Sequence, residues 1–279
     1  MGKLIISAFS DEYASSFDAQ LEAMRGFGVG NIEIRGVDGK NISALTEREV
    51  VDAARKLREY GISVSAIGSP LGKINIDGDV PAHLELARRV FWTAAELGTD
   101  RIRMFSFYLP EGKSRAECRG RIFSALESLV KLAEEHGVIL CHENEAGIYG
   151  ESPEDCLDIA SYFDGRIKCV FDMGNFVLEG YDPMKAYALL RERIEYFHIK
   201  DAIYAGAIVP AGCGEAKIAA ILNMHKEWSK SDFYASLEPH LQTFDGLNAL
   251  VGKSFDNPYK YESCESAFTD ALARLRKMI

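Results

Sequence analysis

The stretch IFSALESLVKLAEEHGVILCHE (122–143) contains the unit from which most of the chain is built. Its apolar residues recur at helical spacing up to His136, and Gly137 follows, where a left-handed cap suits glycine. VILCHE (138–143) is then an apolar run of strand length. The pattern predicts a helix that ends at a glycine and leads into a strand. That strand ends on a carboxylate, Glu143.

The same alternation of strand and helix patterns extends along the chain. Gly28, Gly61 and Gly98 also follow helical patterns and precede apolar runs. The predicted strands are LIISAF (4–9), NIEIR (31–35), ISVSAI (62–67), RIRMFSF (101–107), VILCHE (138–143), IKCVFD (167–172), IEYFHI (194–199) and FYASLE (233–238). Eight strands in strict alternation with helices predict the α/β class and a single (β/α)8 barrel, for which about 250 residues is typical.

The predicted helix starts support this assignment of strands and helices. Thr46 with Glu49 has capping-box spacing, and Ser152 precedes Pro153, which suits a first helical position. An open doubly wound sheet is the competing fold, but its dinucleotide-binding version needs glycines after the first strand, where this chain has FSDEYAS (9–15). We found no linker or literal repeat, so residues 1–279 are expected to form one domain.

Charge and composition exclude several classes of protein. The net charge of −10 disfavours a nucleic-acid partner, because binding to phosphates needs clustered Lys and Arg. No apolar run approaches the ~18 residues of a membrane span. The six cysteines form no CxxC pair, which argues against a zinc knuckle or a disulfide scaffold. We therefore expect a cytoplasmic protein with no membrane partner.

Four predicted strands in the second half end on groups that bind divalent cations. They are Glu143, Asp172, His198 and Glu238, in CHENE (141–145), VFDMGN (170–175), YFHIKD (196–201) and SLEPH (236–240). In a barrel, side chains from the C-terminal ends of the strands meet at one mouth. Singly, each has an ordinary structural interpretation, such as a helix cap or a core histidine. Together they would repel and desolvate one another without a cation.

Three carboxylates and one imidazole predict one divalent metal ion. Hard oxygen donors suit Mn²⁺ or Mg²⁺ and tolerate Co²⁺ or Zn²⁺. Such an ion polarises a carbonyl and lowers the barrier to removing a proton from the neighbouring carbon. A nearby glutamate then takes that proton and returns it.

The sequence resembles the xylose-isomerase-like TIM-barrel superfamily, and within it the sugar phosphate isomerase/epimerase proteins. Besides the four ligand segments, the resemblance rests on FSDEY (9–13), IEIRGVDGKN (32–41), SAIGSPLGKI (65–74), FSFYLP (105–110), HENEAGIYGESPEDCLDI (142–159), HIKDA (198–202) and VPAGCGE (209–215). It therefore covers nearly the whole chain.

The resemblance implies roles for individual residues. The metal ligands map onto Glu143, Asp172, His198 and Glu238, and related ketose epimerases would make Glu143 and Glu238 the acid and base on opposite faces of an enediolate. The sequence departs from those epimerases at Asn175, where they carry a substrate-binding histidine. This makes metal binding a firmer implication than 3-epimerisation.

Further polar residues at strand ends are candidates for binding a small-molecule carbohydrate. They are Glu33, Ser69, Lys73, Arg103, Tyr149, Asn175, Lys200 and His240, with Arg35 also within reach. Asp201 is expected behind this layer, orienting Lys200 or a metal ligand. For Lys73 and Arg103, a structural ion pair or a solvated surface position is an equally good interpretation.

The leading function is that of a metal-dependent isomerase or epimerase of a small sugar, sugar phosphate or polyol ketone. An inosose-type dehydratase would use the same proton abstraction. Apurinic-site endonucleases share the superfamily but carry additional histidines, and here Ser69 and Pro70 stand where one is expected. A non-catalytic sugar-binding barrel stays open, as does assembly into a homo-oligomer.

Overall fold

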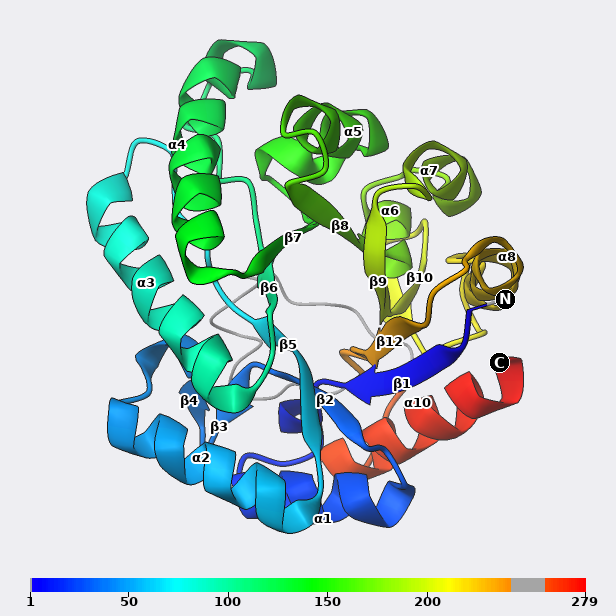
Figure 1. Cartoon of the computed structure of the whole chain (residues 1–279). Helices are drawn as coiled ribbons and strands as arrows, with labels where there is room; N and C mark the ends of the chain where they lie inside the picture. Colours follow the sequence, from blue (N-terminus) through cyan, green and yellow to red (C-terminus); the bar gives the residue numbers. More distant parts are fainter. Residues whose placement is uncertain (1, 242–258) are drawn as a thin grey trace.

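The computed structural model describes residues 2–241 and 259–279. Eight parallel strands form one sheet in the order β1-β12-β9-β8-β7-β6-β5-β2. Their bounds are β1 Leu4–Ala8, β2 Asn31–Ile34, β5 Ser63–Gly68, β6 Arg101–Met104, β7 Ile139–Glu143, β8 Ile167–Asp172, β9 Ile194–Ile199 and β12 Phe233–Leu237. β1 and β2, at the two ends of this order, lie side by side, so the sheet nearly closes into a barrel (Figure 1). The eight predicted strands and the (β/α)8 fold are confirmed.

Helices surround the ring of strands (Figure 1). They are α1 Phe17–Phe27, α2 Glu47–Tyr60, α3 Val80–Leu97, α4 Arg115–His136, α5 Pro153–Tyr162, α6 Met173–Leu178, α7 Pro183–Leu190, α8 Ile218–Trp228 and α10 Cys264–Met278. Strict alternation fails between β8 and β9, because their connection contains both α6 and α7. Asp172 is the N-cap of α6, so this short helix begins directly at a predicted metal ligand. Within the described ranges, no helix is long and apolar enough to cross a membrane.

The predicted helix ends are confirmed. Gly28, Gly61, Gly98 and Gly137 have φ angles of 66°, 68°, 75° and 66°, the left-handed conformation that glycine adopts without a steric cost. Thr46 and Glu49 form a reciprocal capping box. The Ser152 hydroxyl accepts from the Asp155 N–H, and Pro153 is the first residue of α5. Local sequence therefore sets where these helices stop and start.

Side chains alternate between the two faces of each strand. Outward residues such as Leu140, Phe171 and Phe197 join the large core under the helices, whereas Cys141, Val170 and Tyr196 form a small separate cluster inside the barrel. Two residues further along the same strands, Glu143, Asp172 and His198 must also point inwards. The strand register thus brings polar groups together above a small apolar floor.

A hairpin follows β9, made of β10 Asp201–Ile203 and β11 Ala207–Val209. The buried Asp201 carboxylate accepts backbone N–H groups from Ala202, Gly212, Gly214 and Ala216 at 2.7–3.1 Å. A second hairpin, of β3 Gly36–Val37 and β4 Lys40–Asn41, follows β2. Asp201 therefore ties the whole loop 201–216 to the end of β9.

Replacing Asp201 by Asn should destabilise the fold. The amide would turn a donor towards backbone donors and leave at least one buried N–H without an acceptor, which costs about 1–3 kcal/mol. We expect the free energy of unfolding in urea to fall by about 2 kcal/mol. The matched control is Asp182→Asn, at the exposed N-cap of α7, where Asn caps as well as Asp and the change should stay below about 0.5 kcal/mol. Equal losses in the two variants would contradict this account.

Candidate metal centre

The four predicted ligands converge. Glu143, Asp172, His198 and Glu238 each offer one ligand atom, and these atoms all lie within 4.8 Å of one another. All four residues are buried. They end or follow β7, β8, β9 and β12, which are consecutive neighbours in the barrel, so they form an arc along one side of its mouth. The two glutamates stand at the ends of this arc, with the aspartate and the histidine between them.

His198 directs its Nδ1 at the three carboxylates. Nδ1 lies 3.1 Å from Glu143 Oε1, 3.3 Å from Glu238 Oε2 and 3.9 Å from Asp172 Oδ2. Burial alone would lower the pKa of His198, but the surrounding charges, chiefly those of Glu33 and Glu143, raise it well above its ordinary value. A positive charge at this point is therefore strongly favoured, whether it comes from a proton or a metal ion.

The donor set fits a divalent metal ion. Glu238 Oε2 is buried and makes no hydrogen bond of acceptable geometry within the described residues, although His198 Nδ1 is 3.3 Å away and Lys200 Nζ is 3.2 Å away. A buried carboxylate oxygen without such a bond is costly, and coordination would remove that cost. Three oxygens and one imidazole nitrogen are suitable ligands for Mg²⁺, Mn²⁺ or Zn²⁺.

Three fixed cations already oppose these carboxylates. Lys200 Nζ donates to Asp172 Oδ2 at 2.9 Å, Arg103 Nη1 donates to Glu143 Oε2 at 3.2 Å, and Arg35 Nη1 donates to Glu238 Oε1 at 2.9 Å. The pKa of Glu143 is lowered to about 2, because His198 and Arg103 outweigh its burial. Burial raises the pKa of Asp172 to about 6 despite the contact with Lys200. The carboxylates are thus only partly neutralised by the protein.

Lys200 is held in place from behind. A Cβ on Gly174 would lie 2.8 Å from both Lys200 Cγ and the Lys200 carbonyl oxygen, so only glycine allows α6 to approach this closely. Asn175, on the same helix, accepts from Lys200 Nζ at 3.1 Å and donates from Nδ2 to Glu143 Oε1 at 3.3 Å. Asn175 therefore connects Lys200 with one end of the arc.

Several other predicted substrate-binding residues lie around the arc. The Glu33 carboxylate meets His198 Nε2 and the Tyr196 hydroxyl. Ser69 donates its hydroxyl to the Arg103 carbonyl. His240 Nε2 lies 3.4 Å from Glu238 Oε1, and burial lowers the pKa of His240 to about 4. These contacts surround the four ligands with groups that orient them.

Lys73 lies at the edge of this group. Its ammonium is 3.1 Å from Glu145 Oε2 and 4.3 Å from the centre of the Phe105 ring. Phe105 also lies beneath Arg103, whose guanidinium carbon is 4.9 Å from the ring centre. An aromatic face of this kind supports two cations near the mouth.

Two of the predicted residues, Tyr149 and Asp201, direct their side chains at partners other than the four candidate ligands. The Tyr149 hydroxyl donates to Asp158 of α5, and the ring packs against Phe123 of α4. The Asp201 carboxylate is fully used by the loop that follows β9 and makes no hydrogen bond to Lys200 or to a ligand in the described part of the chain. Their side chains serve local structure in this conformation.

Other residues of the site are not among those predicted from the sequence. Asp11 and Glu12 follow β1 and both bind Arg35, and burial together with neighbouring charge raises the pKa of Glu12 to about 8. Asn144 donates from Nδ2 to the Asp172 carbonyl and accepts from the Asp172 N–H, which ties β7 to β8. Asp11 and Glu12 could have been predicted from the sequence, because they follow the first predicted strand as the other candidates follow theirs. Asn144 carried no such signal.

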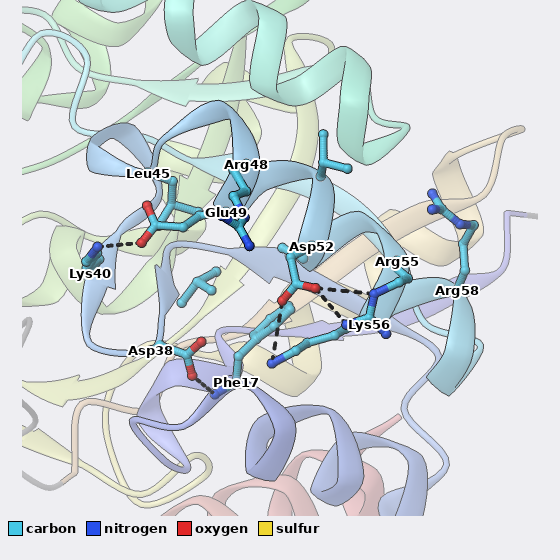
Figure 2. A pocket seen from close by; sticks show the side chains of 13 residues that line it. Phe17, Asp38, Lys40, Leu45, Arg48, Glu49, Asp52, Arg55, Lys56 and Arg58 are labelled. Atoms are coloured by element: carbon cyan, nitrogen blue, oxygen red, sulfur yellow. Dashed lines mark hydrogen bonds and ion pairs between the residues drawn. The ribbon is translucent and has the colours of Figure 1, made fainter.

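A hollow of ≈ 570 Å³ lies elsewhere, beside α2 and the β3–β4 hairpin (Figure 2). Its charged residues largely satisfy one another: Lys40 pairs with Glu49, and Arg55 and Lys56 both approach Asp52. Most of its charged side chains are exposed, unlike the buried group at the barrel mouth. We therefore place the chemistry at the mouth and not at this hollow.

Comparison with known proteins supports the fold. Solved structures of several proteins resemble the chain over nearly its whole length. D-allulose 3-epimerase from a Methylomonas species matches with a TM-score of 0.76 and 16% identity, covering 100% of this chain and 99% of that one. The IolI protein, solved with a bound zinc atom, matches with a TM-score of 0.76 and 20% identity, covering 99% and 97%.

The third structure is AsbF from Bacillus anthracis, described as a probable 3-DHS dehydratase. It matches with a TM-score of 0.70 and 17% identity, covering 98% of each chain. At these identities the likeness shows the fold alone. No curated protein matches the chain significantly by sequence.

The family model gives a closer assignment. The model for the xylose isomerase-like TIM barrel matches residues 21–229, which span the strands from β2 to β9 and so include three of the four candidate ligands. This stretch is about three quarters of the chain. The chain belongs to the family of xylose isomerase-like TIM barrels.

Proposed function

We propose that this protein is a divalent-metal-dependent isomerase or epimerase of a small sugar, sugar phosphate or polyol ketone. The observation that carries the proposal is the convergence of Glu143, Asp172, His198 and Glu238 within 4.8 Å at the mouth of the barrel. The epimerase among the similar structures, and the zinc atom bound by another, agree with this assignment. Mn²⁺ or Mg²⁺ is the preferred ion on the donor chemistry.

The position of the two glutamates suits proton transfer in two directions. Glu143 and Glu238 stand at opposite ends of the arc, on β7 and after β12. A divalent ion bound between them would supply Lewis-acid polarisation of a carbonyl and its neighbouring hydroxyl. One glutamate oxygen then takes the proton from the carbon next to the carbonyl. Return of a proton from the other glutamate to the opposite face gives epimerisation, and return to the adjacent carbon gives isomerisation.

The fixed cations would assist the negatively charged intermediate. Lys200 and Arg103 both lie within hydrogen-bond distance of ligand carboxylates, so they can donate to substrate oxygens that approach the same carboxylates. Lys73, near the rim and paired with Glu145, is the best placed group for a phosphate or a carboxylate on the substrate. The four candidate ligands and the three fixed cations, Arg35, Arg103 and Lys200, are buried, which favours proton transfer in a site with little water.

A dehydratase is the second candidate. Proton abstraction by one glutamate, followed by protonation of a leaving hydroxyl by the other, would expel water from the same enediolate. The similarity to AsbF favours keeping this candidate. A nuclease is a weaker candidate, because buried Ser69 bonds to the Arg103 carbonyl where an additional metal-binding histidine would be expected.

Metal binding is the first test of the proposal. The purified protein, stripped with a chelator, should bind one Mn²⁺ per chain in isothermal titration. Asp172→Asn should weaken binding by roughly 100-fold or more, since loss of even an indirect partner costs about 10–100-fold. Glu195→Gln is the matched control, because Glu195 pairs with Arg101 at the far end of β9 and should leave affinity unchanged. A wild-type protein that binds no divalent ion would refute the proposal.

Proton exchange tests the chemistry. A panel of ketoses, ketose phosphates and inososes incubated in D₂O with Mn²⁺ should incorporate deuterium at the carbon next to the carbonyl, as followed by NMR. Glu238→Gln should reduce exchange by roughly 10²–10⁴-fold, the usual contribution of one acid–base group. Its affinity for the sugar, measured at saturating Mn²⁺, should stay close to that of the wild type.

The products of the same panel separate the candidates. An unchanged mass with an altered configuration identifies an isomerase or epimerase, whereas loss of one water molecule identifies a dehydratase. Sugar binding by an inert wild-type protein that retains its metal would identify a non-catalytic binding barrel and would contradict the proposed activity.

Lys200 should oppose the metal ion electrostatically. Its ammonium is 2.9 Å from Asp172 Oδ2, and two like charges about 4 Å apart repel by about 4 kcal/mol at an effective dielectric constant near 20. After solvent and structural relaxation, Lys200→Met should bind Mn²⁺ about tenfold more tightly while exchange in D₂O slows. Unchanged or weaker Mn²⁺ affinity in this variant would show that Lys200 does not compete with the ion.

A further inference from the structure

Glu33 makes contacts that do not suit a substrate-binding residue. Both carboxylate oxygens are used inside the barrel: Oε1 accepts from the Tyr196 hydroxyl at 2.8 Å, and Oε2 lies 3.0 Å from His198 Nε2. The side chains of Glu33 and His198 are completely buried. Glu33 therefore faces the side of the imidazole opposite to the three ligand carboxylates.

The backbone directs Glu33 to this position. The register between β2 and β5 shifts between Ile32 and Glu33, so that Ile32 pairs with Val64 and Glu33 pairs with Ala66. The extra residue, Ser65, belongs to β5, whereas β2 keeps the regular alternation that turns Glu33 into the barrel. Ile32 and Ile34 remain in the outer core, while Glu33 reaches across the interior to β9.

The contact decides which nitrogen of His198 can bind a metal ion. Carboxylate oxygens face both ring nitrogens, but three of them converge only on the Nδ1 side, where a dication can replace the hydrogen. Nε2 faces Glu33 and keeps its hydrogen. With hydrogen on Nε2, a neutral imidazole has its lone pair on Nδ1. Nδ1 is the nitrogen that lies 3.1 and 3.3 Å from the oxygens of Glu143 and Glu238.

We infer that Glu33, held by Tyr196, is a positioning residue that fixes His198 with its hydrogen on Nε2 and its Nδ1 lone pair directed at the metal. Tyr196 and His198 are two residues apart on β9 and point into the barrel together, so one strand supplies both partners of Glu33. Glu33, which the sequence predicts to bind substrate, would instead support the metal ligand His198. The inference rests on the proposed metal site but not on which reaction takes place there.

Three variants of the full-length protein test the inference, with Zn²⁺ as the probe because it is diamagnetic. Glu33→Met removes the acceptor at similar length and should weaken Zn²⁺ binding about 10–100-fold. Glu33→Gln keeps an acceptor oxygen and should lose less than about tenfold. Tyr196→Phe removes one contact to Glu33 and should weaken binding only a few-fold. Glu195→Gln, on the same strand, should bind Zn²⁺ as the wild type does.

The tautomer gives a readout that a purely structural role would not change. In protein labelled with ¹⁵N-histidine, with His198 assigned from the His198→Gln spectrum, the wild type should show hydrogen on Nε2 and metal-bound Nδ1. Glu33→Gln should keep this pattern. Glu33→Met should lose it or show a mixture of tautomers.

Wild-type Zn²⁺ affinity and an unchanged His198 pattern in Glu33→Met would overturn the inference. If Glu33→Met does not fold, Glu33→Gln and Tyr196→Phe decide, because wild-type affinity in both would also overturn it. If the wild type binds no Zn²⁺, the proposed function fails. The chemical shift of the Nε2 hydrogen can still be compared between the metal-free wild type and metal-free Glu33→Met. An identical chemical shift in the two proteins would reject the role of Glu33.

Discussion

The burial of many carboxylates in one small volume is the constraint on which the mouth of this barrel depends. Buried anions are tolerated only when opposite charges or hydrogen bonds surround them. The protein meets this requirement with cations from three different strand ends, Arg35, Arg103 and Lys200, each directed at a different ligand carboxylate. These ion pairs are therefore a condition for assembling the site, and their geometry also determines which carboxylate oxygens remain for a ligand. Glu238 Oε2 is one of these oxygens.

The fold brings these charged groups together and holds each of them in a fixed orientation. Strands β7, β8, β9 and β12 are neighbours in the barrel. On β7, β8 and β9, the inward side chain two residues beyond the apolar floor is a candidate ligand. Backbone-directed contacts then fix the orientation: Asn144 joins β7 to β8, and Asp172 caps α6 with the oxygen that does not face Lys200. Each ligand is thus held by a rigid element and a specific partner, which is what preorganised chemistry requires.

The fold and the convergence of the four candidate ligands were predictable because both depend on local patterns. Strand runs, glycine caps and a polar residue at each strand end are visible in the order of residues alone, as at Gly137 and Glu143. The roles of Glu33 and Tyr149 were not, because both stand near strand or loop ends and only three-dimensional packing decides where such side chains turn. Inside the barrel Glu33 meets His198 of β9, while Asp158 holds Tyr149 on the outer side. Pairings such as Arg35 with Glu238, 203 residues apart, likewise depend on barrel closure.

The charge that the protein leaves uncompensated corresponds to that of one divalent ion. Burial raises the pKa of Glu12 to about 8, which favours its protonated form near pH 7, and lowers the pKa of His240 to about 4, which favours the neutral imidazole. Five carboxylates then remain against three fixed cations, a difference of two negative charges; the carboxylates are Asp11, Glu33, Glu143, Asp172 and Glu238. A proton on His198 offsets only one of these charges, whereas a dication beside neutral His198 offsets both. A monovalent ion would leave the mouth anionic and opposed to an enediolate, so charge balance itself favours a divalent cofactor.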